Sequence, residues 1–211
     1  MLGVIFDMDG VLVDSNAAHF EAFKKLGEQI GVPFTRELLQ RTVGMHNNQI
    51  FPIWLGAGIA QSEITRLAGE KEQIYRSIAR GTLREIPSAR VLVKRLYDEG
   101  IPLAVGSSGP RENVELAIET LGLAPFFKVR VTGSDVTHGK PNPEIFLKAA
   151  EKLGLRPSDC VVIEDAPQGV RAALAAGMRV IAVTTTCPAS ELSAATRVVS
   201  SLDEIGSKFF P

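Results

Sequence analysis

The sequence predicts an α/β fold in which a doubly wound, mostly parallel sheet forms a core that carries an inserted α-helical module. Two observations support this prediction. Short apolar runs without polar alternation, which are typical of strands covered on both faces, alternate with helix-like segments along the second half of the chain. Between residues 15 and 83 this alternation stops, and apolar residues recur with helical spacing instead.

The strands of the core are expected in five apolar runs. They cover residues 3–6, 102–106, 129–132, 160–163 and 179–183. Helices are expected between the later strands, because each of those segments begins at a proline that suits a first helical turn and ends before a glycine. They cover residues 110–121, 143–153 and 167–176. This order favours right-handed crossovers, with helices on both faces of the sheet.

Residues 15–83 are expected to form a helical cap domain, and residues 1–14 with 84–211 to form the core domain. The insert follows the carboxyl end of the first strand, where ligands of open α/β sheets bind. A lid over a binding site is therefore favoured over a helical decoration packed on the core. In the tail, residues 198–199 are a candidate edge strand and residues 202–205 a candidate short helix.

Composition and charge exclude several classes of protein. The 211 residues are 45% hydrophobic and 22% charged, as is typical of a globular chain that can bury a sizeable core. A net charge of −1 offers no electrostatic reason to expect nucleic acid or an anionic membrane as a partner. The chain opens without a basic leader and has no membrane-like span, and its two cysteines lack metal-site spacing, so we expect a soluble cytoplasmic protein.

The strongest chemical signal lies where the first expected strand ends. Asp7 and Asp9 stand one residue apart and are followed by Gly10. Carboxylates at the end of a buried strand are costly unless a cation or hydrogen bonds compensate them. A calcium loop is excluded, because leucine and alanine occupy the positions that would need glycine and a bidentate glutamate. Taken alone, the motif leaves a tight turn and a metal site as alternatives.

Later segments carry polar groups of complementary chemistry. Ser107 and Ser108 follow a strand just before a helix, where hydroxyl and N–H groups suit an anion; an ordinary serine cap is the alternative. Lys140 lies in a stiff Gly-Lys-Pro loop and is either a surface lysine or a charge held for phosphate. Glu164 and Asp165 end another buried strand and offer the hard oxygen ligands that Mg²⁺ prefers.

In a parallel sheet these segments converge on one edge. Carboxylates, hydroxyls, amides and a lysine in one place predict a phosphate-binding site that contains Mg²⁺ and a nucleophile. Their joint occurrence outweighs the separate structural explanation of each motif.

The motifs and their order resemble those of the haloacid dehalogenase superfamily, in particular its branch with a helical cap, which includes β-phosphoglucomutase and sugar-phosphate phosphatases. The resemblance covers nearly the whole chain and implies a five-stranded parallel core. It rests, in chain order, on Asp7-x-Asp9-Gly10, Ser107, Lys140 and Glu164-Asp165.

The resemblance also implies roles for the matching residues. Asp7 would attack phosphorus, and Asp9 would act as the general acid and base, with its backbone carbonyl also contacting Mg²⁺. The residues implied to bind the transferring phosphate are Ser107, Ser108 and Lys140, and those implied at the Mg²⁺ site are Asp7, Asp9, Glu164 and Asp165.

The expected activity is that of a Mg²⁺-dependent phosphatase acting through an aspartyl phosphate on a small phosphorylated metabolite, a sugar or polyol phosphate. A phosphotransferase of the β-phosphoglucomutase type is the alternative, and a non-catalytic binding protein on the same fold is a third possibility. We expect a monomer or a weak homo-oligomer.

Candidate substrate residues of the cap are His19, His46 and Asn47. Asp14 and His19 resemble the hinge aspartate and the first cap-helix histidine of β-phosphoglucomutase; a helix cap and a partly buried histidine are the alternatives. Near the position where the mutase has an arginine that grips the second phosphate of a bisphosphate, this chain has Asn47; Arg41 and Arg80 are the alternatives for that role, but neither matches the motif. Loss of a bidentate anion clamp favours the phosphatase.

Overall fold

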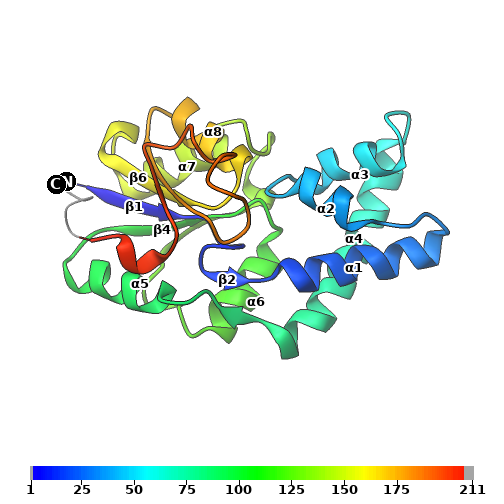
Figure 1. Cartoon of the computed structure of the whole chain (residues 1–211), viewed down its shortest axis with the longest axis horizontal. Helices are drawn as coiled ribbons and strands as arrows, with labels where there is room; N and C mark the ends of the chain where they lie inside the picture. Colours follow the sequence, from blue (N-terminus) through cyan, green and yellow to red (C-terminus); the bar gives the residue numbers. More distant parts are fainter. Residues whose placement is uncertain (1, 207–211) are drawn as a thin grey trace.

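The computed structural model describes residues 2–206 and confirms the α/β fold class. Its main sheet is parallel and has the strand order β5-β4-β1-β6-β7-β8, with the strands pointing toward the cap in Figure 1. The strands are β1 (Gly3–Phe6), β4 (Leu103–Gly106), β5 (Val129–Val131), β6 (Cys160–Glu164), β7 (Arg179–Val183) and β8 (Arg197–Val199). Because β1 lies between β4 and β6, the residues that follow it stand at the centre of the sheet edge.

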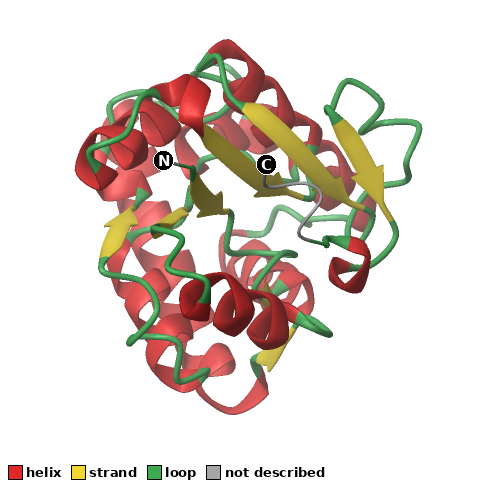
Figure 2. Cartoon of the chain, turned by 90° about the vertical axis from the view of Figure 1, so that its left-hand side faces the viewer, coloured by secondary structure: helices red, strands yellow, loops and turns green. Residues whose placement is uncertain are grey.

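Alternating side chains of the strands face two helical layers, which Figure 2 shows on either side of the sheet. The flanking helices are α5 (Ala89–Asp98), α6 (Arg111–Thr120), α7 (Glu144–Leu153) and α8 (Pro167–Ala175). Val4 and Phe6 of β1 pack with α5 and α6, whereas Ile5 packs with α7 and α8. Neighbouring residues of a strand point to opposite faces, so strands buried on both sides are apolar throughout.

A helical cap lies beyond the carboxyl edge of the sheet, on the right of Figure 1. Its helices are α1 (Asn16–Ile30), α2 (Arg36–Thr42), α3 (Asn47–Leu55) and α4 (Gln61–Thr82). They enclose an apolar cluster of their own, which includes Phe23, Phe51 and Trp54. The base of the cap is different, because Ala18 of α1 and Tyr75 of α4 belong to the large cluster that also covers β1.

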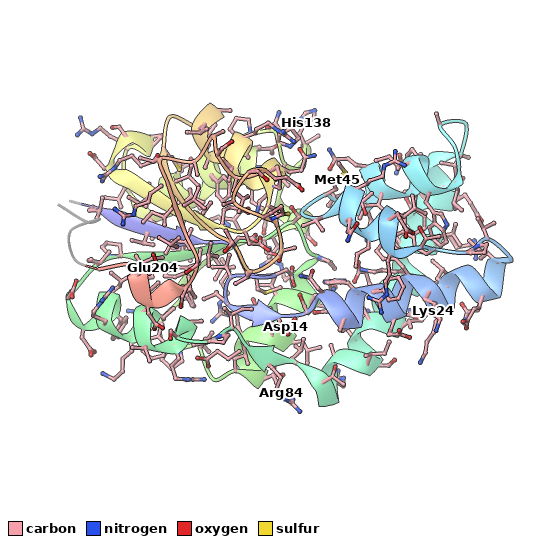
Figure 3. The ribbon with its side chains drawn as sticks, viewed as in Figure 1. Asp14, Lys24, Met45, Arg84, His138 and Glu204 are labelled. Carbon is pink, nitrogen blue, oxygen red and sulfur yellow. The ribbon has the colours of Figure 1, made fainter. Side chains whose placement is uncertain are left out.

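A two-stranded antiparallel ribbon carries the chain into and out of the cap. β2 (Val13–Asp14) pairs with β3 (Arg84–Glu85), and Asp14 lies opposite Arg84; both are labelled in Figure 3. The ribbon therefore holds the two cap connections side by side, next to the end of β1.

Some elements depart from the sequence expectations. The pattern does not predict β2 and β3, because two residues are too few for an alternation to be seen. Helix α5 was not predicted from the sequence either, although its buried residues Leu92, Val93 and Leu96 have helical spacing. The sheet has six strands and not the five implied by the resemblance, because the candidate edge strand pairs in parallel with β7.

Within residues 2–206, no helix has the length and apolar character needed to cross a membrane. The division into a core of residues 1–14 and 84–211 and a cap of residues 15–83 stays a prediction. The same holds for the cytoplasmic location and the monomeric or weakly associating state.

Candidate active site

Side chains from three neighbouring strand ends and one loop meet at the carboxyl edge of the sheet. Asp7 follows β1, Ser107 follows β4, and Glu164 ends β6. Lys140 comes from the loop before α7 and is buried beside them, with 1% of its surface exposed. The parallel pairing of β1 with β4 and β6 thus brings together residues that are far apart in the sequence.

Lys140 is held between two buried carboxylates. Its Nζ donates hydrogen bonds to Asp7 Oδ1 and to Glu164 Oε1, each at 2.6 Å. Burial by itself would lower the pKa of Lys140, but the charges of Asp7 and Glu164 outweigh that effect and raise the pKa. The surface-lysine alternative is therefore wrong, and Lys140 is a fixed positive charge inside the site.

The acidic residues at this edge form a group that could hold one cation. Asp7, Glu164 and Asp165 each offer a carboxylate oxygen, and these atoms lie within 4.8 Å of one another. Burial raises the pKa of Asp7 to about 7 although Lys140 opposes the shift, and burial with the charge of Glu164 raises the pKa of Asp165 as well. These carboxylates face one buried ammonium group, that of Lys140, so a divalent cation would offset the negative charge that remains. A donor set made only of oxygen fits Mg²⁺.

Two glycines leave room for the acidic side chains. Gly10 has a φ of +75°, and a Cβ on it would collide with the carboxylate of Asp165. Gly169 lies in the first turn of α8, and a Cβ there would overlap the carboxylate of Glu164. The second oxygen of Glu164 accepts hydrogen bonds from the backbone N–H groups of Asp165 and Ala166. The backbone therefore sets the position of both carboxylates.

Asp9 faces partners different from those of Asp7. Ser15 Oγ donates a hydrogen bond to Asp9 Oδ1 at 2.5 Å, and His19 Nε2 lies 3.6 Å from the same oxygen. Burial by itself would raise the pKa of Asp9, but the contacts with His19 and Ser15 outweigh that effect and lower it. The side chain of Asp9 is not part of the carboxylate group around Asp7, so its expected contact with Mg²⁺, through the backbone carbonyl, stays a prediction.

A buried chain of polar groups runs from Asp9 into the cap. Lys71 Nζ lies 2.9 Å from His19 Nδ1 and 2.9 Å from Glu72 Oε1. Because an ammonium group only donates, Nδ1 accepts, and neutral His19 carries its proton on Nε2, which faces Asp9. The His19 ring also stacks on Tyr75 with the ring centres 4.0 Å apart. The cap thereby determines the direction of the hydrogen bond offered to Asp9.

Ser107 and Ser108 lie on the side of the site where an anion is expected. Ser107 is buried, and its Oγ accepts a hydrogen bond from the backbone N–H of Gly109. Ser108 Oγ donates to the carbonyl oxygen of Gly44 in the cap at 3.2 Å. Both residues precede α6, whose N-terminus contributes partial positive charge.

A cavity of about 100 Å³ lies between the core and the cap. The predicted site residues that line it are Asp7, Asp9, His19, Asn47, Ser108, Lys140 and Asp165. Ser107 and Glu164 lie behind this lining and contact it through Gly109 and Lys140. Met45, labelled in Figure 3 at the edge of the cap nearest the core, belongs to an apolar part of the wall.

Two residues singled out from the sequence do not line the cavity. His46 is the N-cap of α3: its Nδ1 accepts from the backbone N–H of Asn48, and its own N–H donates to Gln49 Oε1. Asp14 is exposed in the ribbon. Their contacts are structural, and a role of either residue in substrate binding stays a prediction.

Lys71 and Glu72 are two buried charged residues of the cavity wall that were not predicted from the sequence. Lys71 lies on the apolar face of α4, four residues after Leu67 and four before Tyr75. A charge on the apolar face of a helix is the signal that could have revealed this pair, because burying a charge requires partners.

The chain matches the family model described as haloacid dehalogenase-like hydrolase over residues 4–183. It therefore belongs to this family of enzymes. Its relatives include phosphatases and a phosphomutase.

The chain is 35% identical over 182 residues to a phosphorylated carbohydrates phosphatase of Thermotoga maritima. This match covers 84% of this chain and 82% of that protein. It is 33% identical over 190 residues to β-phosphoglucomutase of Bacillus subtilis, with 87% and 83% covered. The crystal structure of β-phosphoglucomutase from Clostridium difficile has a TM-score of 0.89 and 25% identity, and the match covers 99% of this chain and 95% of that one.

Proposed function

We propose that this protein is a Mg²⁺-dependent phosphatase that hydrolyses the monophosphate ester of a sugar or polyol. The observation that carries the proposal is the environment of Asp7, which lies 2.6 Å from the ammonium of Lys140 and within 4.8 Å of an oxygen of Asp165. A nucleophile, a fixed cation and hard oxygen ligands in one cavity are the parts that phosphoryl transfer needs. The relative named for phosphorylated carbohydrates supports the substrate class.

The reaction would run in two steps. First, a carboxylate oxygen of Asp7 bonds to phosphorus while the bond to the leaving oxygen breaks, and Asp9 gives its proton to that oxygen, so the product leaves as an alcohol. Second, a water molecule bonds to phosphorus, Asp9 takes the proton from it, and the bond between phosphorus and Asp7 breaks to release phosphate. Lys140, Ser107 and Ser108 would hold the phosphoryl oxygens in both steps.

The first step needs Asp7 ionised and Asp9 protonated. The protein's own groups set the opposite order, because burial raises the pKa of Asp7 to about 7, whereas contacts with His19 and Ser15 lower the pKa of Asp9 against the effect of burial. When bound, Mg²⁺ supplies positive charge that favours ionised Asp7 and offsets the charge on the phosphoryl oxygens. The negative charge of a bound phosphate favours the proton on Asp9.

Hydrolysis is favoured over the mutase reaction because a mutase of this type must also hold the second phosphate of a bisphosphate. Asn47 stands near the position where the mutase motif has an arginine for that purpose, and an amide provides no charge for it. The apolar part of the cavity wall likewise suits an uncharged substrate body.

The proposal is tested by measuring phosphate release from p-nitrophenyl phosphate and from a panel of sugar and polyol phosphates. We expect release that depends on Mg²⁺ and stops on chelation. β-Glucose 1-phosphate supplied with its bisphosphate activator separates the two activities: isomerisation to glucose 6-phosphate that outruns phosphate release would favour the mutase. If no compound of the panel is turned over, the result would favour a non-catalytic binding protein on the same fold.

A further inference from the structure

The cap side of the cavity has almost no free positive charge. Of the described cap residues that line it, Lys71 is the only one with a permanent positive charge, and Glu72 is the only acidic one. The ammonium of Lys71 is already engaged by His19 and Glu72, each at 2.9 Å, and lies 4.6 Å from the centre of the Phe23 ring. The ammonium group of Lys71 is therefore not free to bind a negatively charged ligand.

Glu72 also determines how Asn47 is oriented. Asn47 Nδ2 donates a hydrogen bond to Glu72 Oε1 at 2.8 Å. A carboxylate accepts and does not donate, so the NH₂ end of the amide has to face Glu72. Among the described residues, no donor bonds to the other end of the amide, Asn47 Oδ1. The position at which a clamp for a second phosphate would be expected thus presents an acceptor.

The carboxylate of Glu72 is anchored to the core as well as to the cap. Its Oε2 accepts a hydrogen bond from Asn113 Nδ2 of α6 at 2.6 Å, and Asn113 Oδ1 accepts from Arg76, one turn further along α4, at 3.1 Å. Burial by itself would raise the pKa of Glu72, but the charge and the hydrogen bond of Lys71 outweigh that effect and lower the pKa to about 2. Glu72 is therefore ionised and held in place across the boundary between cap and core.

We propose that Glu72 and Asn47 select a substrate with a single phosphate and a neutral, hydroxyl-bearing body, and that they reject a second phosphate on that body. This inference rests on the proposed function in that it assigns the first phosphate to the Asp7 side of the cavity. A hydroxyl can donate to Asn47 Oδ1 or to the lone pair still free on Glu72 Oε2. A phosphate dianion has no proton to donate and would lose its hydration beside two acceptors.

The test uses Asp7→Asn protein, which should bind substrates without turning them over, and isothermal titration calorimetry with Mg²⁺ present. The probes are glucose 6-phosphate and fructose 6-phosphate, with glucose 1,6-bisphosphate and fructose 1,6-bisphosphate as matched partners. We expect the dissociation constant of at least one monophosphate to be lower than that of its bisphosphate by about tenfold or more. The reason is that the second phosphate of the bisphosphate would lie beside the buried negative charge of Glu72.

Glu72→Gln in the same background should reduce this preference by about tenfold, because it removes the charge, frees Lys71 and allows Asn47 to turn its NH₂ group toward the ligand. Asn47→Ala is a second variant that retains the charge: it should weaken the monophosphate by roughly fivefold, the effect of one lost hydrogen bond, while the bisphosphate stays excluded. Glu63→Gln, an exposed position on the same helix α4, is the matched control and should change neither affinity.

Equal affinity for both members of each pair, an unchanged preference in Glu72→Gln, or no binding of either monophosphate would each overturn the inference. The proposed function fails separately. If a monophosphate binds the Asp7→Asn protein selectively but the wild-type protein releases no phosphate from it, the selectivity stands and the phosphatase assignment falls.

Discussion

At the scale of the residue, the site is built from charges that depend on one another. Lys140 neutralises part of the charge of Asp7 and Glu164. Burial, together with the negative charge of Glu164 and Asp7, raises the pKa of Asp165. The motifs that carry these residues could be recognised in the sequence, because each is a short run of chemically distinctive residues after an apolar strand. Glu72 belongs to no such run: the local signal for it is the charge of its neighbour Lys71 on the apolar face of α4, and its contact with Asn113 appears only in the structure.

Substitution of the two motif aspartates should abolish turnover for different reasons. Asp7→Asn removes the nucleophile, so phosphate release should fall to background. Asp9→Asn retains the nucleophile but removes the proton donor, so kcat should fall by roughly 10²–10⁴-fold. Phosphate release and circular dichroism of the purified variants provide the measurement, with the exposed Asp98→Asn as control. Substantial activity in Asp7→Asn protein would refute the nucleophile assignment.

The raised pKa of Asp7 predicts a pH-dependent effect of Mg²⁺ on stability. Native Asp7 keeps its proton up to about pH 7, whereas in the unfolded chain the proton is lost near pH 3.8. Without Mg²⁺, the contribution of Asp7 to the free energy of unfolding is therefore complete below pH 3.8 and is lost as the pH rises through 7. Mg²⁺ binds the ionised carboxylate, so it should raise the melting temperature more at about pH 8 than at about pH 5.5.

Thermal melts at both pH values, with Mg²⁺ and with EDTA, measure this effect. Asp7→Asn protein is the control, since it lacks the titrating group and should show a smaller difference between the two pH values. A Mg²⁺ effect that is equal at both values, or larger in acid, would contradict the prediction.

At the scale of the element, helix and strand ends place the functional groups. The glycine stops predicted from sequence have the left-handed backbone that favours glycine, with φ of +59° at Gly122, +71° at Gly154 and +73° at Gly177. Such signals are local, so the sequence contains them. The ribbon of β2 and β3 depends instead on pairing between residues about 70 positions apart, and it has no local signal.

The close approach of α8 to β6 predicts opposite effects for the same substitution in two helices. Gly169→Ala should lower the free energy of unfolding by about 1–3 kcal/mol and weaken Mg²⁺-dependent activity, because the added methyl group displaces the Glu164 carboxylate. Gly69→Ala in α4 meets no neighbouring atom and should raise the free energy of unfolding by up to about 1 kcal/mol. Urea unfolding and phosphatase assays of both variants test the pair; equal effects would show that Glu164 is not held as described.

At the scale of the whole molecule, the cap is joined to the core by more than its two connections. Tyr75 and Ala79 of α4, with Ala18 and Ala22 of α1, pack in the apolar cluster that covers β1. Gln49 of α3 also donates a hydrogen bond to the backbone carbonyl of Lys140 at 3.2 Å. The base of the cap therefore shares its stability with the sheet.

This shared cluster predicts that cap and core unfold together. The only tryptophan, Trp54, lies in the cap, so its fluorescence reports cap unfolding, whereas far-ultraviolet circular dichroism reports the whole chain. We expect the two signals to follow one transition in urea with the same midpoint. A fluorescence transition at lower urea than the circular dichroism transition would show that the cap unfolds on its own.

The α/β class and the catalytic candidates of the core could be predicted from the sequence, because buried strands have a visible pattern and parallel strands must end at one edge of their sheet. Tertiary structure decided how the cap meets that edge. The contacts of Glu72 with Asn47 and Asn113 depend on the placement of whole helices against each other, and the contact of Asp9 with His19 depends on where α1 lies relative to the segment after β1. That placement results from packing over many residues at once, and no short stretch of sequence encodes it.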